Sequence, residues 1–565
     1  MREYTIGQIS RLLNVKPHIL RYWEKELPFL SPKKNLGGRR VYSEIDLQLL
    51  YRIRYLIHEK GYTLSGAGKR VWEDLNSSDP NLLGKVRYLR GELIRLLDII
   101  DEGRKKEAMT DTIKLFREKG QEHLFRYWER RDERQRERLI RDLNRLDLEM
   151  LGILQKRLKE EKKKKPKLDP IDFVSIDESR RDIDALRAGK DFIRAGKTAF
   201  LTVAGGQGSR LGFEGPKGMF PISPIRGASL FQIFSEKVMA ARKIYGVPMP
   251  WLIMTSILNY EDTVNYFEEN AFFGLEENDI YFFKQDVLPS LYPDGRLVLA
   301  PDGGLFKNPN GHGGVIEALK RSGMLDMLNE RGIEELFYFQ VDNPLVQVPD
   351  PLFLGWHLKY GSEMSTKVIE KAYPEEKLGS IGLIDGKPGV IEYSDLDLDL
   401  KLARNEDGRL LYSHGSIAVH ILNVDFLRKQ EGKLPYHLAF KSVKTLKPTD
   451  TGADIIEEEA VKFEMFLFDA IPFARNPLFF ETSRREEFSP LKNREGVDSI
   501  ETCIRGQIEK YASWLERVGT RVRRDEKGMS VHKIEISPLF ALDLEVLKTK
   551  RNEIPKEINN ETLII

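Results

Sequence analysis

Residues 198–220 read TAFLTVAGGQGSRLGFEGPKGMF, an apolar run that passes directly into a loop rich in glycine. The six residues from Thr198 to Val203 are mostly apolar, which is typical of a buried parallel strand. Glycine at positions 205, 206, 208, 212, 215 and 218 lets the backbone turn tightly and bring its N–H groups against an anion. Arg210 and Lys217 add two cations nearby. The stretch therefore predicts a polyphosphate-binding loop.

Two common glycine loops do not fit this spacing. A Walker A loop needs Gly-Lys-Ser/Thr, but Pro216 separates Gly215 from Lys217 and a glycine follows in place of the hydroxyl. The dinucleotide fingerprint needs GxGxxG, and the spacing here is GxGxxxG. The pattern that does fit is a nucleotidyltransferase loop, in which a lysine after proline faces the phosphates of a nucleoside triphosphate.

Three motifs resemble one enzyme family. AGGQGSRLGFEGPKGM, residues 204–219, resembles the signature of the eukaryotic-type UDP-N-acetylhexosamine pyrophosphorylases, within the UDP-sugar pyrophosphorylase family. GQEHLFRYW, residues 120–128, resembles that family's helical N-terminal segment, and SRREEFSPLKN, residues 483–493, matches nearly letter for letter. The resemblance spans about residues 113–495, and it implies transfer of a uridylyl group from UTP to a sugar 1-phosphate.

The resemblance also implies roles for individual residues of this chain. Gln285 would contact uracil, Lys492 would meet the phosphate of the sugar, and Glu392 would meet sugar hydroxyls. The implied catalytic residues are Arg210, Lys217 and Lys492; the nucleotide-binding residues are Gly205, Gly206, Gln207, Gly208, Gln285 and Gly311; the sugar-binding residues are His312, Glu392 and Ser416.

Asp342 is the candidate metal ligand. It follows the apolar run 336–341, so a carboxylate emerges at the end of a predicted strand, where a Mg²⁺ ion that bridges phosphates needs a hard oxygen ligand. An aspartate in this position can instead cap a following helix. VDNPLVQVPDP resembles the family's VDN motif, which favours Asp342 as the ligand of Mg²⁺ or Mn²⁺.

Two positions that bear on the choice of sugar depart from the family pattern. Members that use N-acetylhexosamines carry asparagine in a PDGNGG motif and in a GNIANH motif, whereas this chain has His312 and Ser416 there. A site that lacks a polar group built to pair with a substrate discriminates weakly. We therefore expect a relaxed choice among glucose, galactose and N-acetylglucosamine 1-phosphates.

The fold class follows from the order of elements beyond the glycine loop. Helical and strand patterns alternate from about residue 230 to residue 360, which predicts a doubly wound α/β sheet with ligands at the carboxyl ends of its strands. The resemblance makes this a nucleotide-diphospho-sugar transferase-like catalytic domain. A second helical region is expected from Ile113 to Leu158, and the charged run 160–167 is expected to be an exposed loop.

The first 75 residues predict a different domain. Residues 4–14 have helical spacing, Pro17 opens a second helix, and SPKKNLGGRRVYS then forms a basic hairpin before a third helix capped by Ser43. Residues 3–75 resemble the MerR family of winged helix-turn-helix regulators. This resemblance implies that duplex DNA is bound by Arg21, Tyr22, Arg39 and Arg40. The alternative is a small helical domain that binds protein.

Residues 82–100 carry an apolar repeat in steps of four and three, from Leu82 to Ile100, which is a short heptad pattern. It predicts a dimerisation helix that makes a homodimer, or else an amphipathic helix packed on its own domain. The predicted domains are thus 1–75 (winged helix), 76–111 (dimerisation helix and linker) and 112–565 (pyrophosphorylase), the last divided at 170 and 495 into a helical segment, the α/β core and a C-terminal segment.

Charge and composition agree with this division. The 565 residues carry a formal net charge of +2, yet residues 1–165 hold 39 Lys and Arg against 26 Asp and Glu, and the rest hold 51 against 62. A basic end beside an acidic remainder indicates an anionic partner such as DNA. The single cysteine excludes a disulfide framework, and no run predicts a signal peptide or membrane span, so we expect a cytoplasmic protein. Two functions remain open: an active uridylyltransferase fused to a DNA-binding regulator, or a regulator that only senses a UDP-sugar.

Overall fold

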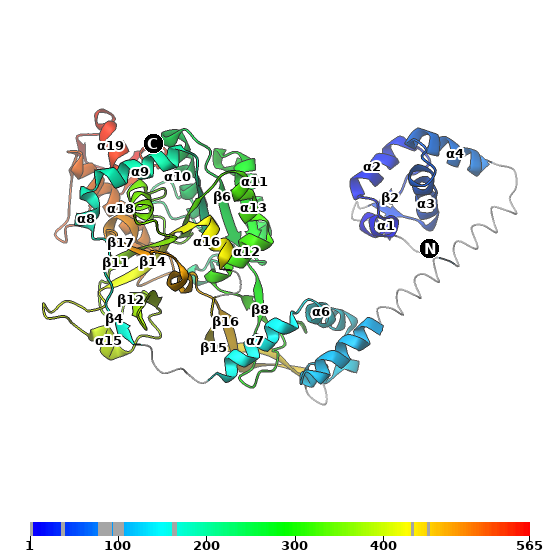
Figure 1. Ribbon diagram of the computed structural model, residues 1–565. Coiled ribbons are helices and arrows are strands. Elements are labelled where there is room, and N and C mark those ends of the chain that lie inside the picture. The colour runs from blue at the N-terminus through cyan, green and yellow to red at the C-terminus, as the bar shows by residue number, and fades with distance from the viewer. Residues whose placement is uncertain are drawn as a thin grey trace. The chain divides into compact units, whose positions relative to one another are not determined.

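The computed structural model describes residues 4–34, 40–76, 93, 107–160, 167–430, 434–448 and 453–565. The chain divides into two compact units, Met1–Asp111 and Thr112–Ile565, whose elements are labelled in Figure 1. Across the described ranges, no helix has both the length and the apolar character needed to cross a membrane.

The first unit is a small helical domain with a hairpin, as predicted, and the two-residue strand β1 extends this hairpin to a three-stranded sheet. Pro17 begins the second helix, and Ser43 caps the third, where its hydroxyl accepts a hydrogen bond from the Asp46 N–H at 3.2 Å. Strand β3 pairs antiparallel with β1 and β2, which forms the predicted hairpin, although its turn at 35–39 lies outside the described residues. The elements are β1 (Tyr4–Thr5), α1 (Ile6–Leu13), α2 (Pro17–Glu26), β2 (Lys33–Lys34), β3 (Arg40–Tyr42), α3 (Glu44–His58) and α4 (Leu64–Asn76).

The end of the first unit and the beginning of the second contain the longest stretches outside the described residues. The predicted heptad helix at 82–100 and most of the charged run at 160–167 fall outside the described residues. Between them, helical structure covers 107–118 and continues through two short 3₁₀ turns into two helices, which confirms the predicted helical region. These helices are α6 (Glu133–Asn144) and α7 (Leu148–Lys159).

The second unit is built on one ten-stranded sheet. Its parallel part has the order β10-β5-β6-β7, with helices between successive strands as the alternating pattern predicted. The strands are β5 (Thr198–Val203), β6 (Trp251–Thr255), β7 (Ile280–Lys284) and β10 (Glu335–Gln340), and the helices are α10 (Leu230–Tyr245), α11 (Tyr260–Glu269), α12 (Val315–Arg321), α13 (Met324–Glu330) and α14 (Pro351–Tyr360).

The other half of the sheet is mostly antiparallel and was not anticipated from the sequence. Strand β14 pairs antiparallel with β10, β11 and β12, so it joins the parallel core to a second set of strands. These strands are β4 (Leu168–Asp169), β11 (Met364–Glu370), β12 (Ser380–Ile384), β13 (Lys387–Ile391), β14 (His414–Asn423) and β17 (Leu478–Glu481). This half matters for function because it forms the walls of the larger cavity described below.

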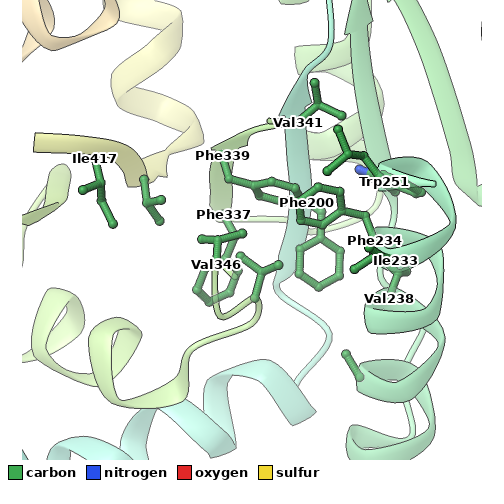
Figure 2. Close-up of a cluster of buried hydrophobic side chains, with 14 of the residues drawn as sticks. Phe200, Ile233, Phe234, Val238, Trp251, Phe337, Phe339, Val341, Val346 and Ile417 are labelled. Carbon is green, nitrogen blue, oxygen red and sulfur yellow. The ribbon is translucent and has the colours of Figure 1, made fainter. Parts of the chain in front are cut away.

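Aromatic side chains fill the core between the parallel strands and α10 (Figure 2). Phe200 of β5 and Phe337 of β10 have ring centroids 6.1 Å apart, and Phe234 of α10 lies 4.7 Å from Phe339. Large rings packed at these spacings contribute hydrophobic burial and favourable ring contacts. They hold the strand ends, and therefore the loops that follow them, in fixed positions.

Elements around the sheet complete the unit. A long hairpin, β15 (His437–Pro448) with β16 (Ala453–Glu464), contacts β8 (Val287–Pro289) and β9 (Lys307–Pro309). Smaller elements are α8 (Ile176–Arg181), α9 (Ile183–Arg194), α15 (Leu398–Leu402), α16 (Val424–Lys429) and α17 (Arg484–Glu487). The C-terminal segment forms α18 (Ile500–Arg517), β18 (Arg521–Val522), β19 (Ile534–Ile536), α19 (Leu544–Thr549), β20 (Glu557–Ile558) and β21 (Thr562–Ile564) around its own apolar cluster.

Candidate active site

The glycine loop after β5 is closed by its own backbone. The Gly208 N–H donates to the Gly215 carbonyl at 2.8 Å, and the Lys217 N–H donates to the Gly206 carbonyl at 3.0 Å. A side chain at 208 would place its Cβ 2.8 Å from the Phe213 ring, and one at 218 would place it 2.2 Å from the Phe231 ring. Part of the glycine pattern therefore serves packing within the loop, and the remainder leaves space for a ligand.

A cavity of about 280 Å³ lies beside this loop. Gly205 and Gly206 line it from the start of the loop after β5, Lys217 from the end of that loop, and Gln285 from the position after β7. The Gln285 amide donates to the Gly311 carbonyl at 2.6 Å, which joins two of the predicted nucleotide-binding positions. The cavity thus collects Gly205, Gly206, Gln285 and Gly311, whereas Gln207 and Gly208 do not line it.

Gly311 allows a close approach of two backbones. Its φ of 83° lies in the left-handed region, and a Cβ there would stand 2.4 Å from the carbonyl oxygen of Met465. The Gly313 N–H also donates to that carbonyl, at 2.8 Å. The segment that carries His312 is therefore held against the chain that leaves β16.

A larger cavity of about 510 Å³ adjoins the first, and residues of β13 and β14 line it together with the loops that follow β11, β13 and α17. Four predicted residues line this cavity alone: Arg210 from the glycine loop, Glu392 after β13, Ser416 in β14, and Lys492 after α17. Arg210 lies in this cavity rather than in the smaller one that holds Lys217. Lys492 Nζ is 3.1 Å from the Asp498 carboxylate, so its charge is already partly compensated.

Three residues line both cavities, namely His312, Gln340 and Asp342. They mark the junction at which a group in one cavity would meet a group in the other. His312 and Asp342 were predicted site residues, whereas Gln340, the last residue of β10, was missed. Since side chains alternate along a strand, a polar residue two positions before Asp342 was a usable signal for it.

His312 is fixed as a neutral hydrogen-bond donor. The Leu467 N–H donates to its Nδ1 at 3.2 Å, which leaves the ring proton on Nε2. Burial against Phe466 and Phe468 lowers the pKa of the imidazole to about 4. Although His312 replaces the family's asparagine, it still offers one N–H at the junction.

Asp342 and Lys217 face each other across the smaller cavity. Their charged atoms are 3.6 Å apart, and the side chains are 14% and 19% exposed, so both remain accessible to a ligand. The described residues hold no cluster of three or more His, Cys, Asp or Glu that could bind a metal by themselves. This fits Mg²⁺, which commonly uses one or two carboxylates together with substrate phosphates.

Glu392 has an unusual electrostatic setting. Burial in the larger cavity raises the pKa of its carboxyl to about 7, and the nearby Asp395 adds to the effect. A carboxyl group with this pKa can donate or accept a hydrogen bond near neutral pH. Such a group suits the hydroxyls of a sugar.

Several residues of the larger cavity were not predicted. Tyr373, Lys377 and Gly379 come from the segment between β11 and β12, and Tyr393 follows Glu392. Charge alone could not have singled out Lys377 among the many lysines of the chain. These residues are brought to the site by antiparallel pairing, which leaves no local signal in the sequence.

The predicted DNA-binding residues lie on the helix-turn-helix and its hairpin. Arg21 and Tyr22 are exposed on α2, Tyr22 with 55% of its side chain accessible. Arg40 on β3 is exposed as well, and its Nε is 2.7 Å from the Glu24 carboxylate of α2. Arg39 lies outside the described residues.

Comparison with known proteins covers both units. Residues 149–501 match a family model described as UTP--glucose-1-phosphate uridylyltransferase, and residues 4–71 match one described as MerR HTH family regulatory protein. The chain is 34% identical over 449 residues to UDP-N-acetylglucosamine pyrophosphorylase of Saccharomyces cerevisiae, which covers 74% of this chain and 93% of the yeast protein.

Two further relatives agree. UDP-N-acetylglucosamine diphosphorylase 2 of Arabidopsis thaliana is 33% identical over 467 residues, with 78% of this chain and 88% of the plant protein covered. The crystal structure of the uridine diphosphate N-acetylglucosamine pyrophosphorylase from Trypanosoma brucei superposes with a TM-score of 0.68 at 24% identity. It covers 81% of this chain and 98% of that one, and it supports the fold.

Proposed function

Since the chain belongs to the UTP–glucose-1-phosphate uridylyltransferase family and carries an N-terminal MerR helix-turn-helix domain, we propose that it forms a UDP-sugar and pyrophosphate from UTP and a hexose 1-phosphate. The observation that carries this proposal is the pair of adjoining cavities with His312, Gln340 and Asp342 at their junction. The smaller cavity takes the uridine nucleotide and the larger one takes the sugar phosphate.

The chemistry needs no covalent intermediate. A phosphate oxygen of the sugar 1-phosphate attacks the α-phosphorus of UTP in line, and the bond from that phosphorus to the leaving pyrophosphate breaks. Reactions of this class depend on positioning and on neutralising phosphate charge. Lys217 supplies positive charge to the leaving pyrophosphate from the smaller cavity. Arg210 and Lys492, which line the larger cavity, neutralise and hold the attacking phosphate.

Asp342 is the residue proposed to hold Mg²⁺ or Mn²⁺. When bound, the ion neutralises phosphate charge. Lys217 Nζ lies 3.6 Å from the Asp342 carboxylate, so a cation already stands beside the proposed metal ligand. His312 contributes a neutral N–H at the junction, where it can donate to a phosphate or sugar oxygen without adding charge.

The test is pyrophosphate release by the full-length protein from UTP with a panel of sugar 1-phosphates. UDP-sugar formation that requires both substrates and a divalent cation supports an enzyme. No turnover with any sugar phosphate, together with measurable UDP-sugar binding, would instead support the sensor function. We expect activity with N-acetylglucosamine, glucose and galactose 1-phosphates, because the family's two asparagines are replaced by His312 and Ser416.

A second function is favoured by the first unit. We propose that residues 1–111 bind duplex DNA as a homodimer, with α2 in the major groove and the β2–β3 hairpin on the backbone. Arg21→Ala and Arg40→Ala are expected to weaken a full-length complex whose affinity falls steeply with salt, since phosphate contacts release counterions. Gel retardation at low salt and sedimentation measure binding and oligomeric state. A monomer that binds no DNA would contradict the proposal.

A further inference from the structure

The turn that follows Asp342 is held by buried lysines. Residues 343–347 leave the sheet after β10 and have no strand or helix of their own. Lys237 Nζ donates to the carbonyls of Pro344 and Val346, each at 2.6 Å. Lys510 Nζ donates to the intervening carbonyl of Leu345 at 2.8 Å. Three consecutive carbonyls are therefore satisfied by two ammonium groups.

These lysines come from elements far apart in the sequence. Lys237 lies on α10, and Lys510 lies on α18 in the C-terminal segment, for which the sequence suggested no role. Each side chain is only 8% exposed, and burial lowers the pKa of both amino groups. A lysine with either charge state keeps N–H donors, so the contacts to the turn do not depend on ionisation.

A second group of buried charged residues also holds this turn. Lys367 is fully buried and lies 2.6 Å from both the Glu487 and the Asp350 carboxylates. Glu487 in turn accepts from the Gln347 N–H at 3.2 Å, and its own carbonyl accepts from the Asn343 amide at 2.7 Å. The Val346 side chain meanwhile points into the aromatic core (Figure 2).

Buried lysines of this kind contribute little to the free energy of unfolding. Taking an amino group out of water is expensive, and apolar residues of similar volume are often as good or better for folding. What the lysines do supply is directional donors that define where an irregular backbone runs. That backbone begins at Asp342, whose carbonyl also accepts from the Leu491 N–H at 2.8 Å, next to Lys492.

We propose that Lys237 and Lys510 are positioning residues that fix Asp342 for the metal–nucleotide complex. The inference rests on the proposed function of Asp342, and it assigns a role in the active site to the C-terminal helix α18. Neither lysine lines either of the two site cavities, so each acts on Asp342 only through the turn.

The test measures the gain in UTP affinity that Mg²⁺ provides. UTP binding to the full-length protein is measured by calorimetry in Mg²⁺ and in EDTA, and the ratio of the two dissociation constants reports the metal interaction. Lys237→Met and Lys510→Met keep most of the side-chain volume but lose the donors. Loss of a partner that orients a metal ligand typically weakens metal affinity by about 10- to 100-fold, so this ratio should fall by about that factor while binding in EDTA stays unchanged.

Two controls make the result specific. Asp342→Ala should abolish the Mg²⁺-dependent gain. Gln507→Leu is the matched structural control, since Gln507 is also buried on α18 but donates to the Ile222 carbonyl, at 3.0 Å, away from the turn. Gln507→Leu should lower the melting temperature without changing the ratio.

Equal ratios in wild type and both methionine variants would overturn the inference, as would an equal loss in Gln507→Leu. If Lys237→Met does not fold, Lys510→Met decides the matter together with Lys510→Arg, which retains donors and should keep most of the gain. Because UTP binding needs no sugar substrate, a wild-type protein without turnover would contradict the proposed function and leave this measurement intact.

Discussion

The two cavities of the candidate active site are made in different ways. The smaller one is shaped mainly by backbone, through the glycine loop and the Gly311 carbonyl, which accepts a hydrogen bond from the Gln285 amide. The larger one is shaped by side chains from the antiparallel strands and the segments between them, including Glu392 and Ser416. A backbone site recognises phosphate and base with little freedom to vary, whereas a side-chain site can change its ligand by substitution.

This difference explains why the nucleotide is easier to infer than the sugar. The class of ligand at the glycine loop can be inferred from a short stretch of sequence, because few other functions need so many glycines after a buried strand. The sugar cavity depends on pairings between segments that are distant in the sequence. The following predictions test how far the two cavities are independent.

The largest effect is expected for the facing charges of Lys217, in the smaller cavity, and Asp342, at the junction of the two cavities. Lys217→Ala and Asp342→Ala should each lower kcat by about 10²–10³, because each removes a preorganised group that acts on developing phosphate charge. Initial rates of pyrophosphate release measure this, and circular dichroism checks that the fold is intact. A variant with near wild-type kcat would show that its residue is not part of the reaction centre.

The second prediction tests the backbone-built cavity alone. In Gly311→Ala the new Cβ would stand 2.4 Å from the Met465 carbonyl at a φ of 83°, so the segment that carries His312 must move. We expect kcat/KM for UTP to fall by about 10²-fold, as for misplacements near 1 Å. Gly152→Ala in α7, where no atom lies within 4 Å of the added Cβ, is the control and should be unchanged. An unchanged Gly311→Ala enzyme would show that the close approach is not needed.

The two domains, the parallel strands and most of the site residues could be predicted from the sequence, because each carries a local signal. Thr198–Val203 is mostly apolar, which is typical of a buried strand. Pro17 and Ser43 mark the starts of helices, and the VDN motif follows the end of a strand. It missed the antiparallel half of the sheet, because register between β14 and its three neighbours is a long-range property. It also missed Gln340 and the buried Lys510, whose meaning depends on which backbone lies opposite.

The third prediction changes the side-chain-built cavity. Ser416→Asn restores an amide in β14 at the larger cavity, and it should shift kcat/KM toward N-acetylglucosamine 1-phosphate by about tenfold relative to glucose 1-phosphate, the effect of about 1.4 kcal/mol. KM for UTP should stay the same, because Ser416 does not line the smaller cavity. Strict selectivity for the N-acetylated substrate already in the wild type would mean that other residues, such as Gln340, provide the contact.

The smallest expected effect concerns the titratable group of the side-chain-built cavity. The pKa of Glu392 is about 7 in the folded protein, above its ordinary value of 4.5, because burial disfavours the carboxylate. Below pH 4.5 the group is protonated in both the folded and the unfolded chain, so it does not change stability. As the pH rises from 4.5 to about 7, the unfolded chain loses this proton while the folded chain keeps it, and the free energy of unfolding falls.

Glu392→Gln cannot ionise, so its stability relative to wild type should increase across this window and become constant above it. Denaturant unfolding at several pH values measures the difference, with the exposed Glu375→Gln as the control that should show none of it. A difference that is the same at pH 4.5 and pH 7.5 would show that Glu392 ionises freely, and that this cavity is as open to water as the surface around it.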